Sequence, residues 1–80
     1  MTSIPEEKEK CVYATVHRRV TDPYSCAWHK NVENSVDEDF GGFRTLWNEA
    51  WIEFKILEED ADEFVEEFGD AGFKVTIEKI

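Results

Sequence analysis

The sequence predicts a single α+β domain, in which a three- to four-stranded, mostly antiparallel sheet carries a helix on one face. Apolar side chains recur at helical spacing over residues 61–71. They alternate at strand spacing in the flanking segments 52–56 and 73–78. Two further alternating runs, at 11–20 and 26–32, are joined by turn residues, which is typical of a β-hairpin. A chain of 80 residues has room for one small domain.

The extent of the domain and its cellular context follow from composition. Residues 1–9 are polar and charged and are expected to form a flexible tail, so the domain should span residues 10–80. The tail has no apolar run typical of a signal peptide, and no stretch approaches transmembrane length. Two cysteines do not suggest a secreted disulfide scaffold. We therefore expect a cytoplasmic protein without a membrane partner.

The N-terminal hairpin is expected to turn at Asp22 and Pro23. The apolar faces of its two strands coincide only in a register that sets Arg18 opposite Trp28, which would suit a cation–π contact. The side chains expected on the shared inner face are Val12, Ala14, Val16, Val20, Cys26, Trp28 and Val32.

The same register limits what the cysteines and histidines can do. Cys11 and Cys26 would lie roughly 30 Å apart along the ladder, whereas bridged cysteines need Cα atoms within about 7 Å. We therefore expect both to remain thiols. His17 would face His29 across the strands, which with a distant Glu33 is only part of a zinc site, and a surface imidazole pair is the simpler expectation. No metal or other cofactor is predicted.

Residues 35–50 carry mixed signals, and we favour some helix here. Ser35 and Glu38 form a capping-box pattern, followed by apolar side chains at helical spacing. Two adjacent glycines interrupt this pattern, and each destabilises a helix by about 1 kcal/mol relative to Ala. A loop followed by a short helix over 43–48 therefore fits nearly as well. A strand over 43–47 is the weakest match, because one face would hold Phe43, Thr45 and Trp47.

Residues 51–80 are expected to form strand, helix and strand. Asp60 fits the N-cap with Glu63 three residues on, and Gly72 fits the left-handed residue after the C-terminus. If the two strands share a sheet, the helix is a right-handed crossover. The apolar stripe expected to face the sheet consists of Ala61, Phe64, Val65, Phe68 and Ala71.

Calcium binding and catalysis are both poorly supported. Asp37, Asp39 and Gly42 match positions one, three and six of an EF-hand loop. Position five is Gly41 where Asp or Asn is needed, and position twelve is Asn48, with the required Glu one residue late at Glu49. No pattern indicates a carboxylate held beside an apolar wall with a raised pKa, and there is no P-loop or dinucleotide fingerprint. We do not expect an enzyme.

The formal net charge of -10 is concentrated in one half of the chain. Residues 1–34 hold five basic and five acidic side chains, whereas residues 35–80 hold four basic and fourteen acidic ones. Such a surface repels phosphates, so direct binding of nucleic acid is not expected. A basic surface on a partner protein is its natural complement.

The acids between residues 58 and 70 form the strongest functional signal. On a helix they stack like charges four residues apart at four places, at a cost of about 1–2 kcal/mol. The last of them lie near the helix C-terminus, where the dipole disfavours anions. A solvated helix face is the simpler alternative, but stability alone would not select this pattern. The residues expected to bind a partner are Asp37, Glu38, Asp39, Glu59, Asp62, Glu63, Glu66, Glu67 and Asp70.

Exposed aromatic side chains beside the acids would serve as anchors for a partner. Tyr24, Trp47 and Trp51 are the candidates, although for at least two of the three a core position is the better expectation.

Two short motifs add a resemblance to a known class. YATV at 13–16 in an early strand, followed later by strand, acidic helix and AGFKVT at 71–76, resembles the small phage-encoded inhibitors of bacterial RNA polymerase. More broadly, the chain is similar to short acidic phage proteins, including anti-CRISPR and DNA-mimic inhibitors. The resemblance implies a stoichiometric inhibitor in the host cell cytoplasm and assigns no individual residue.

The sequence therefore predicts a non-enzymatic, protein-binding inhibitor whose acidic helix face occupies a basic, nucleic-acid-binding surface of a partner. A phage counter-defence or host-takeover role would follow from the resemblance. The alternative is a small structural or oligomerisation module with no inhibitory role. The prediction is compatible with a monomer or a dimer.

Overall fold

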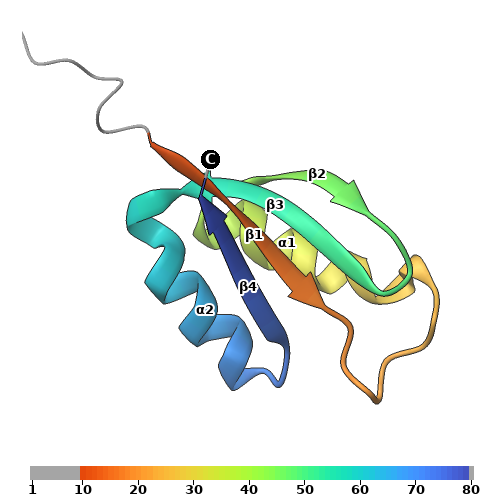
Figure 1. Ribbon diagram of the computed structural model, residues 1–80. Helices are drawn as coiled ribbons and strands as arrows, with labels where there is room; N and C mark the ends of the chain where they lie inside the picture. The colour runs from red at the N-terminus through yellow and green to blue at the C-terminus, as the bar shows by residue number, and fades with distance from the viewer. Residues whose placement is uncertain (1–9, 80) are drawn as a thin grey trace, which may run out of the picture.

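The computed structural model describes residues 10–79, which form a four-stranded antiparallel sheet with two helices on one side (Figure 1). The strand order is β2-β3-β1-β4, so the predicted α+β class is confirmed. The predicted flexible tail, residues 1–9, lies outside the described residues. The elements are β1 (Cys11–His17), η2 (Cys26–Trp28), α1 (His29–Asp39), β2 (Phe43–Trp47), β3 (Trp51–Leu57), η3 (Glu58–Asp60), α2 (Ala61–Asp70) and β4 (Lys74–Lys79).

The order of strands and helices is βαββαβ, with β1 and β3 in the centre of the sheet. This is the split β-α-β arrangement of ferredoxin-like domains. Proteins of that arrangement perform many unrelated functions, so the topology by itself assigns none.

The predicted C-terminal strand, helix and strand are confirmed as β3, α2 and β4. The two strands share the sheet, with β1 hydrogen-bonded between them. Gly72 follows the helix with φ of 94°, the left-handed conformation expected there. Asp60 precedes α2 as predicted, but its side chain makes no capping hydrogen bond. The turn η3 leads into the helix instead.

The core lies between the helices and one face of the two central strands. Alternate side chains of β1 and β3 are fully buried, as a period of two predicts. The helices contribute buried side chains at intervals of four residues. The main core side chains are Val12, Ala14, Val16, Trp28, Val32, Val36, Ile52, Phe54, Ile56, Phe64 and Phe68.

The predicted N-terminal hairpin is wrong. β1 pairs with β3 and β4, and residues 26–32 form η2 and the start of α1. Trp28, Val32 and Val36 are buried from a helix, because a spacing of four residues fits both the helical and the strand period. Ser25 begins the turn, since its Oγ accepts a hydrogen bond from the backbone N–H two residues on, at 3.3 Å.

The contacts expected from that hairpin are absent as well. Arg18 stacks on Tyr24, 3.6 Å from the ring centroid, and not on Trp28. His17 ends β1, whereas His29 is buried at the start of α1, so the two do not form a cross-strand pair.

Two further side chains of the predicted hairpin lie outside the core. Val20 is 95% exposed, and Cys26 is an exposed thiol. No disulfide bond joins Cys11 to Cys26, as expected. The expected reason was wrong, because Cys26 lies in η2 and not on a strand paired with β1.

Residues 35–50 form the end of a helix, a turn and a strand. Some helix is present as predicted, since α1 includes residues 35–39, but the capping pattern at Ser35 does not start it, because α1 runs from His29 to Asp39. Gly41, with φ of 65°, turns the chain toward β2. A Cβ added at Gly42 would lie 2.7 Å from Ile56 Cγ2, so this close approach also requires glycine.

The strand β2 is the alternative that matched the sequence pattern least well. Its alternation is broken by a bulge between Arg44 and Leu46. Phe43 pairs with Lys55 and Leu46 pairs with Glu53, so these two apolar side chains share a face although three positions separate them. A simple period of two could not detect this strand.

Among the described residues, no helix covers the second face of the sheet. Cross-strand partners share a face, so the strand register identifies the side chains that project there. Its two lysines and two glutamates balance. We call this set the open sheet face: Cys11, Tyr13, Thr15, His17, Phe43, Leu46, Trp51, Glu53, Lys55, Leu57, Lys74, Thr76 and Glu78.

Candidate protein-binding face

The nine acids predicted to bind a partner all lie in the helical layer. Three occupy the last turn of α1, one lies in η3 and five lie on α2. All are exposed except Glu67, which is half-buried. We call this set the acidic helical face: Asp37, Glu38, Asp39, Glu59, Asp62, Glu63, Glu66, Glu67 and Asp70.

Aromatic packing holds the acidic end of α1 against α2. Phe40 follows directly after α1, and its ring lies 5.2 Å from that of Phe64 and 6.5 Å from that of Phe68. Phe64 and Phe68 are both buried on the inner side of α2. The acids of two segments that are separate in the sequence are thereby brought together.

Glu67 shows how closely the two groups of acids meet. Its pKa is raised above the usual value, first by burial, then by a hydrogen bond with the Asp39 carboxyl group and by repulsion from Asp39 and Glu63. The field of α2 and that of the end of α1 are therefore continuous.

In the part of the chain that the structure describes, no ion pair compensates this face. Among residues 10–79, the ion pairs join Arg19 to Asp22, Arg44 to Glu33 and Lys79 to Glu58, and none includes an acid of the acidic helical face. Neither α1 nor α2 has a basic side chain in its last turn. Each helix thus places uncompensated carboxylates at its negative end.

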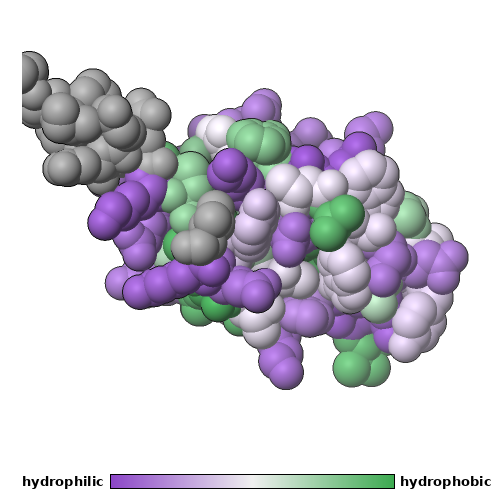
Figure 2. Space-filling view, turned by 45° about the horizontal axis from the view of Figure 1, so that its top comes forward, coloured by the Kyte–Doolittle hydropathy of each residue, from purple (hydrophilic) through white to green (hydrophobic). Residues whose placement is uncertain are grey.

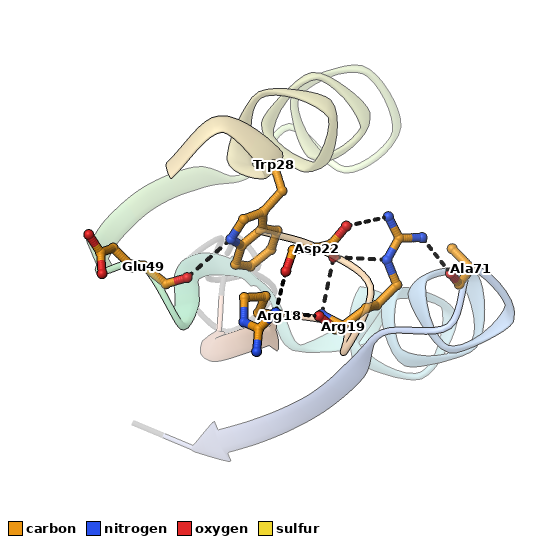
Figure 3. Close-up of polar contacts among 6 residues, drawn as sticks. All are labelled: Arg18, Arg19, Asp22, Trp28, Glu49 and Ala71. Carbon is orange, nitrogen blue, oxygen red and sulfur yellow. Dashed lines mark hydrogen bonds and ion pairs between the residues drawn. The ribbon is translucent and has the colours of Figure 1, made fainter. Parts of the chain in front are cut away.

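Arg19 is the cation that reaches the end of α2, but it leaves the acids unpaired. Its guanidinium donates to the Ala71 carbonyl oxygen at 3.0 Å and forms two 2.9 Å hydrogen bonds to Asp22 (Figure 3). It also lies over the Phe73 ring, 4.2 Å from the centroid. Arg19 satisfies a helix carbonyl group and fixes its own loop.

The outer side of α2 opposes the stability of the helix. Three of the four predicted like-charge pairs lie within α2, whereas Glu59 of the fourth lies in η3. At about 0.2–0.5 kcal/mol for each pair, the three weaken α2 by roughly 1 kcal/mol. The inner stripe offsets this loss.

The inner stripe differs from the prediction at two positions. Phe64 and Phe68 are buried as expected, but Ala71 lies just past α2 and is exposed, and Val65 is 38% exposed. It lies at the margin of the stripe, between acids on the outer side of α2. Val65 is therefore a partly exposed apolar side chain that the helical period assigned to the core.

The aromatic candidates lie elsewhere. Tyr24 is 70% exposed, Trp47 is 47% exposed and Trp51 is half-buried, so the expectation that at least two belong to the core is wrong. Tyr24 holds Arg18, and Trp47 is stacked by Arg44, 3.8 Å from the ring centroid. Both stack on arginines away from α2 and do not anchor its acids.

The described part of the chain contains no group of three or more His, Cys, Asp or Glu side chains arranged to hold a metal ion. His29 is its one buried polar side chain, and neither ring nitrogen has a hydrogen-bond partner. Burial lowers the pKa of His29, which favours the neutral imidazole.

Comparison with known proteins adds no relative. No protein-family model, no curated protein and no solved structure matches this chain. None of the helices within residues 10–79 has the length and apolar character needed to cross a membrane.

Proposed function

We propose that this protein is a non-enzymatic, protein-binding inhibitor whose acidic helical face occupies a basic, nucleic-acid-binding surface of a partner. The meeting of Asp39 with Glu67 and Glu63 carries the proposal, because it joins the acids of two helices into one field without a compensating base. This arrangement weakens the fold, so a basic partner is the better explanation for it.

The density of charge along α2 supports mimicry of a nucleic acid. Five acids lie between Asp62 and Asp70, which at a rise of 1.5 Å per residue gives one charge about every 3 Å. A DNA strand carries one phosphate per roughly 3.4 Å of helix axis. A groove that accepts a phosphate backbone can therefore accept α2 in its place, and the protein itself does not bind nucleic acid.

The resemblance to phage inhibitors gives this proposal a biological setting. A phage-encoded DNA mimic would act in the host cell cytoplasm as a counter-defence or host-takeover protein, of the anti-CRISPR or RNA-polymerase-inhibitor type. It would act stoichiometrically, because blocking a groove requires no chemistry.

Charge reversal at two places tests the proposal. The double variant Glu63→Lys, Glu66→Lys changes the acidic helical face, and the matched control Glu49→Lys, Glu78→Lys changes exposed acids outside it. Each raises the formal net charge from -10 to -6, because every reversal adds two units. The tagged proteins are used to capture partners from bacterial lysate, which are then eluted with salt or with duplex DNA.

We expect the face variant to lose capture, the control to retain it, and the triple variant with Glu67→Lys to abolish it while circular dichroism shows an intact fold. Capture should fall steeply with salt, and duplex DNA should displace the protein, because both occupy one groove. Capture that is insensitive to salt, or equal loss in both double variants, would contradict the proposal.

A further inference from the structure

The two outer strands of the sheet are protected to different degrees. An unprotected edge strand offers its backbone N–H and C=O groups to another strand, and charged side chains, especially lysine, are the usual defence. The outer strand β4 carries Lys74, Glu78 and Lys79, all exposed. The outer strand β2 carries one charge, that of Arg44, which is paired with Glu33 at 2.8 Å. Charge therefore protects β4 and not β2, whose edge is limited only by its length of five residues and by the bulge between Arg44 and Leu46.

The side chains of β2 are unusually apolar for an exposed strand. Phe43 is 60% exposed, Leu46 is 59% exposed and Trp47 is 47% exposed. β2 lies at the top of Figure 1, which Figure 2 turns toward the reader. Hydrophobic side chains, drawn in green, reach the surface in that view. Such a strand combines open backbone groups with apolar side chains that would gain from burial.

We propose that β2 pairs in antiparallel orientation with β2 of a second copy of this chain, so that two sheets join into one. A two-fold axis makes such a pair self-complementary. Phe43 and Leu46 both project from the open sheet face, so the axis places Phe43 beside Leu46 of the partner subunit. The inference goes beyond the proposed inhibitor function and does not depend on it.

The distribution of charge makes β2 the part of the surface that a second copy can approach. Two chains of net charge -10 repel each other, and they can approach only through a surface that carries little of that charge. β2 is such a surface, because Arg44 and Glu33 cancel. The helix α2, with five of the nine acids, packs against β4 and β1 in the other half of the molecule. Pairing through β2 therefore places the two copies of α2 at opposite ends of the dimer.

One acid of the acidic helical face, Asp37, lies near this edge and is kept apart from its copy by the antiparallel orientation. Asp37 lines a surface hollow of about 300 Å³ together with Phe43 and Arg44, near the start of β2. Reversal of the second strand places the start of one β2 beside the end of the other, so the two copies of Asp37 lie at opposite ends of the pair. A strand of five residues buries little surface, so the dimer should be transient.

Sedimentation of the full chain over a range of concentrations tests the proposal. The mean mass should rise from 9.4 kDa toward twice that value. Added salt should leave the dimer unchanged or strengthen it, because salt screens like-charge repulsion. Partner capture by the acidic helical face should instead weaken with salt, so the failure of one proposal is distinguishable from that of the other.

Two matched single variants locate the interface. Leu46→Lys places a charge on β2, and Thr76→Lys places the same charge on exposed β4. We expect Leu46→Lys to raise the dimer Kd by at least about tenfold, as loss of a central interface residue does, and Thr76→Lys to leave it unchanged. Backbone amide exchange of β2 should slow as concentration rises in the parent protein and not in Leu46→Lys.

Leu46 is exposed, so Leu46→Lys should fold, and its circular dichroism verifies this. A chain that remains at 9.4 kDa up to about 1 mM overturns the proposal and leaves β2 to a strand of another protein. A dimer that Leu46→Lys leaves intact, or that Thr76→Lys dissociates, overturns it as well.

Discussion

The two faces of the sheet carry opposite kinds of surface. One face is sealed by helices whose inner sides are apolar and whose outer sides are acidic, whereas the open sheet face is mixed, with balanced charges. The core is complete on one face alone. The excess of negative charge therefore lies on the outside of the helical layer, where it does not stabilise the core.

The largest expected effect compares one phenylalanine from each face. Phe64 is fully buried and lies 4.7 Å from the Phe68 ring and 6.2 Å from the Phe54 ring, whereas Phe43 is 60% exposed. Phe64→Ala should lower the free energy of unfolding by about 3–5 kcal/mol, and Phe43→Ala should change it by no more than about 0.5 kcal/mol. Urea denaturation followed by tryptophan fluorescence measures both. Similar losses would mean that the open sheet face also contributes to the core.

An intermediate effect compares the two histidines, His29 in the helical layer and His17 on the open sheet face. Burial lowers the pKa of both, with a further contribution from Lys74 for His17. Around His29, repulsion from Arg44 acts in the same direction, while Glu33 and the backbone of Asn48 act against it. Both imidazoles are thus held neutral at pH values where an unfolded histidine takes up a proton.

The direction of the pH effect follows from proton binding. Unfolded histidine is protonated below about pH 6.5, so the unfolded chain binds more protons than the folded one between pH 6.5 and the lowered pKa. Stability should be full above pH 6.5 and fall as pH drops through that window, by up to about 1.4 kcal/mol per pH unit for one proton.

Thermal unfolding between pH 7.5 and pH 5 of the parent, His29→Phe and His17→Gln checks this expectation. His29→Phe should flatten the pH dependence more than His17→Gln, because His29 is fully buried whereas His17 is half-exposed and lies 3.3 Å from Thr76 Oγ1. An unchanged slope in His29→Phe would exclude His29 as its source.

The smallest expected effect concerns the acids themselves. Because the pKa of Glu67 is raised, its protonated carboxyl group stabilises the fold at pH values below the ordinary pKa of glutamate. This stabilisation is lost as pH rises through the pKa of Glu67 in the folded protein. At pH 7 the carboxylate therefore opposes folding. Glu67→Gln should raise the free energy of unfolding at pH 7 by about 0.2–0.5 kcal/mol for each like charge relieved.

The matched control is Glu49→Gln, which removes one exposed charge outside the acidic helical face. It should leave the free energy of unfolding nearly unchanged, and the gain from Glu67→Gln should vanish near pH 3, where carboxylates are protonated. Chemical denaturation at the two pH values measures this. Loss of stability in Glu67→Gln would show that Glu67 has a favourable partner in the fold.

The C-terminal half could be predicted because its periods change clearly. Ile52, Phe54 and Ile56 alternate on a strand that is buried on one face, and Phe64 and Phe68 repeat at a helical interval. The acidic helical face could be predicted for the same reason, since a correct helix fixes which side each acid occupies. Its link to the end of α1 needed tertiary contacts, which the sequence does not show.

The N-terminal half could not be predicted from local pattern. Trp28 and Val32 are four residues apart, and that interval fits a strand and a helix equally well. In β2, the bulge between Arg44 and Leu46 removes the alternation that identifies strands. The partners of β1 are distant in the sequence, so the turn residues near Asp22 suggested a nearer partner than the true one.

The central position of β1 also sets the order in which the chain can assemble. Its two neighbours are β3 and β4, and Val12 pairs with Lys79 near the other end of the described chain. Contacts between residues so far apart form slowly, because the intervening chain must first be brought together. During synthesis β1 therefore waits for β3, α2 and β4, and until α2 packs on the sheet its Val12, Ala14 and Val16 side chains lack their final cover. A chaperone that binds short extended apolar segments would find its target here.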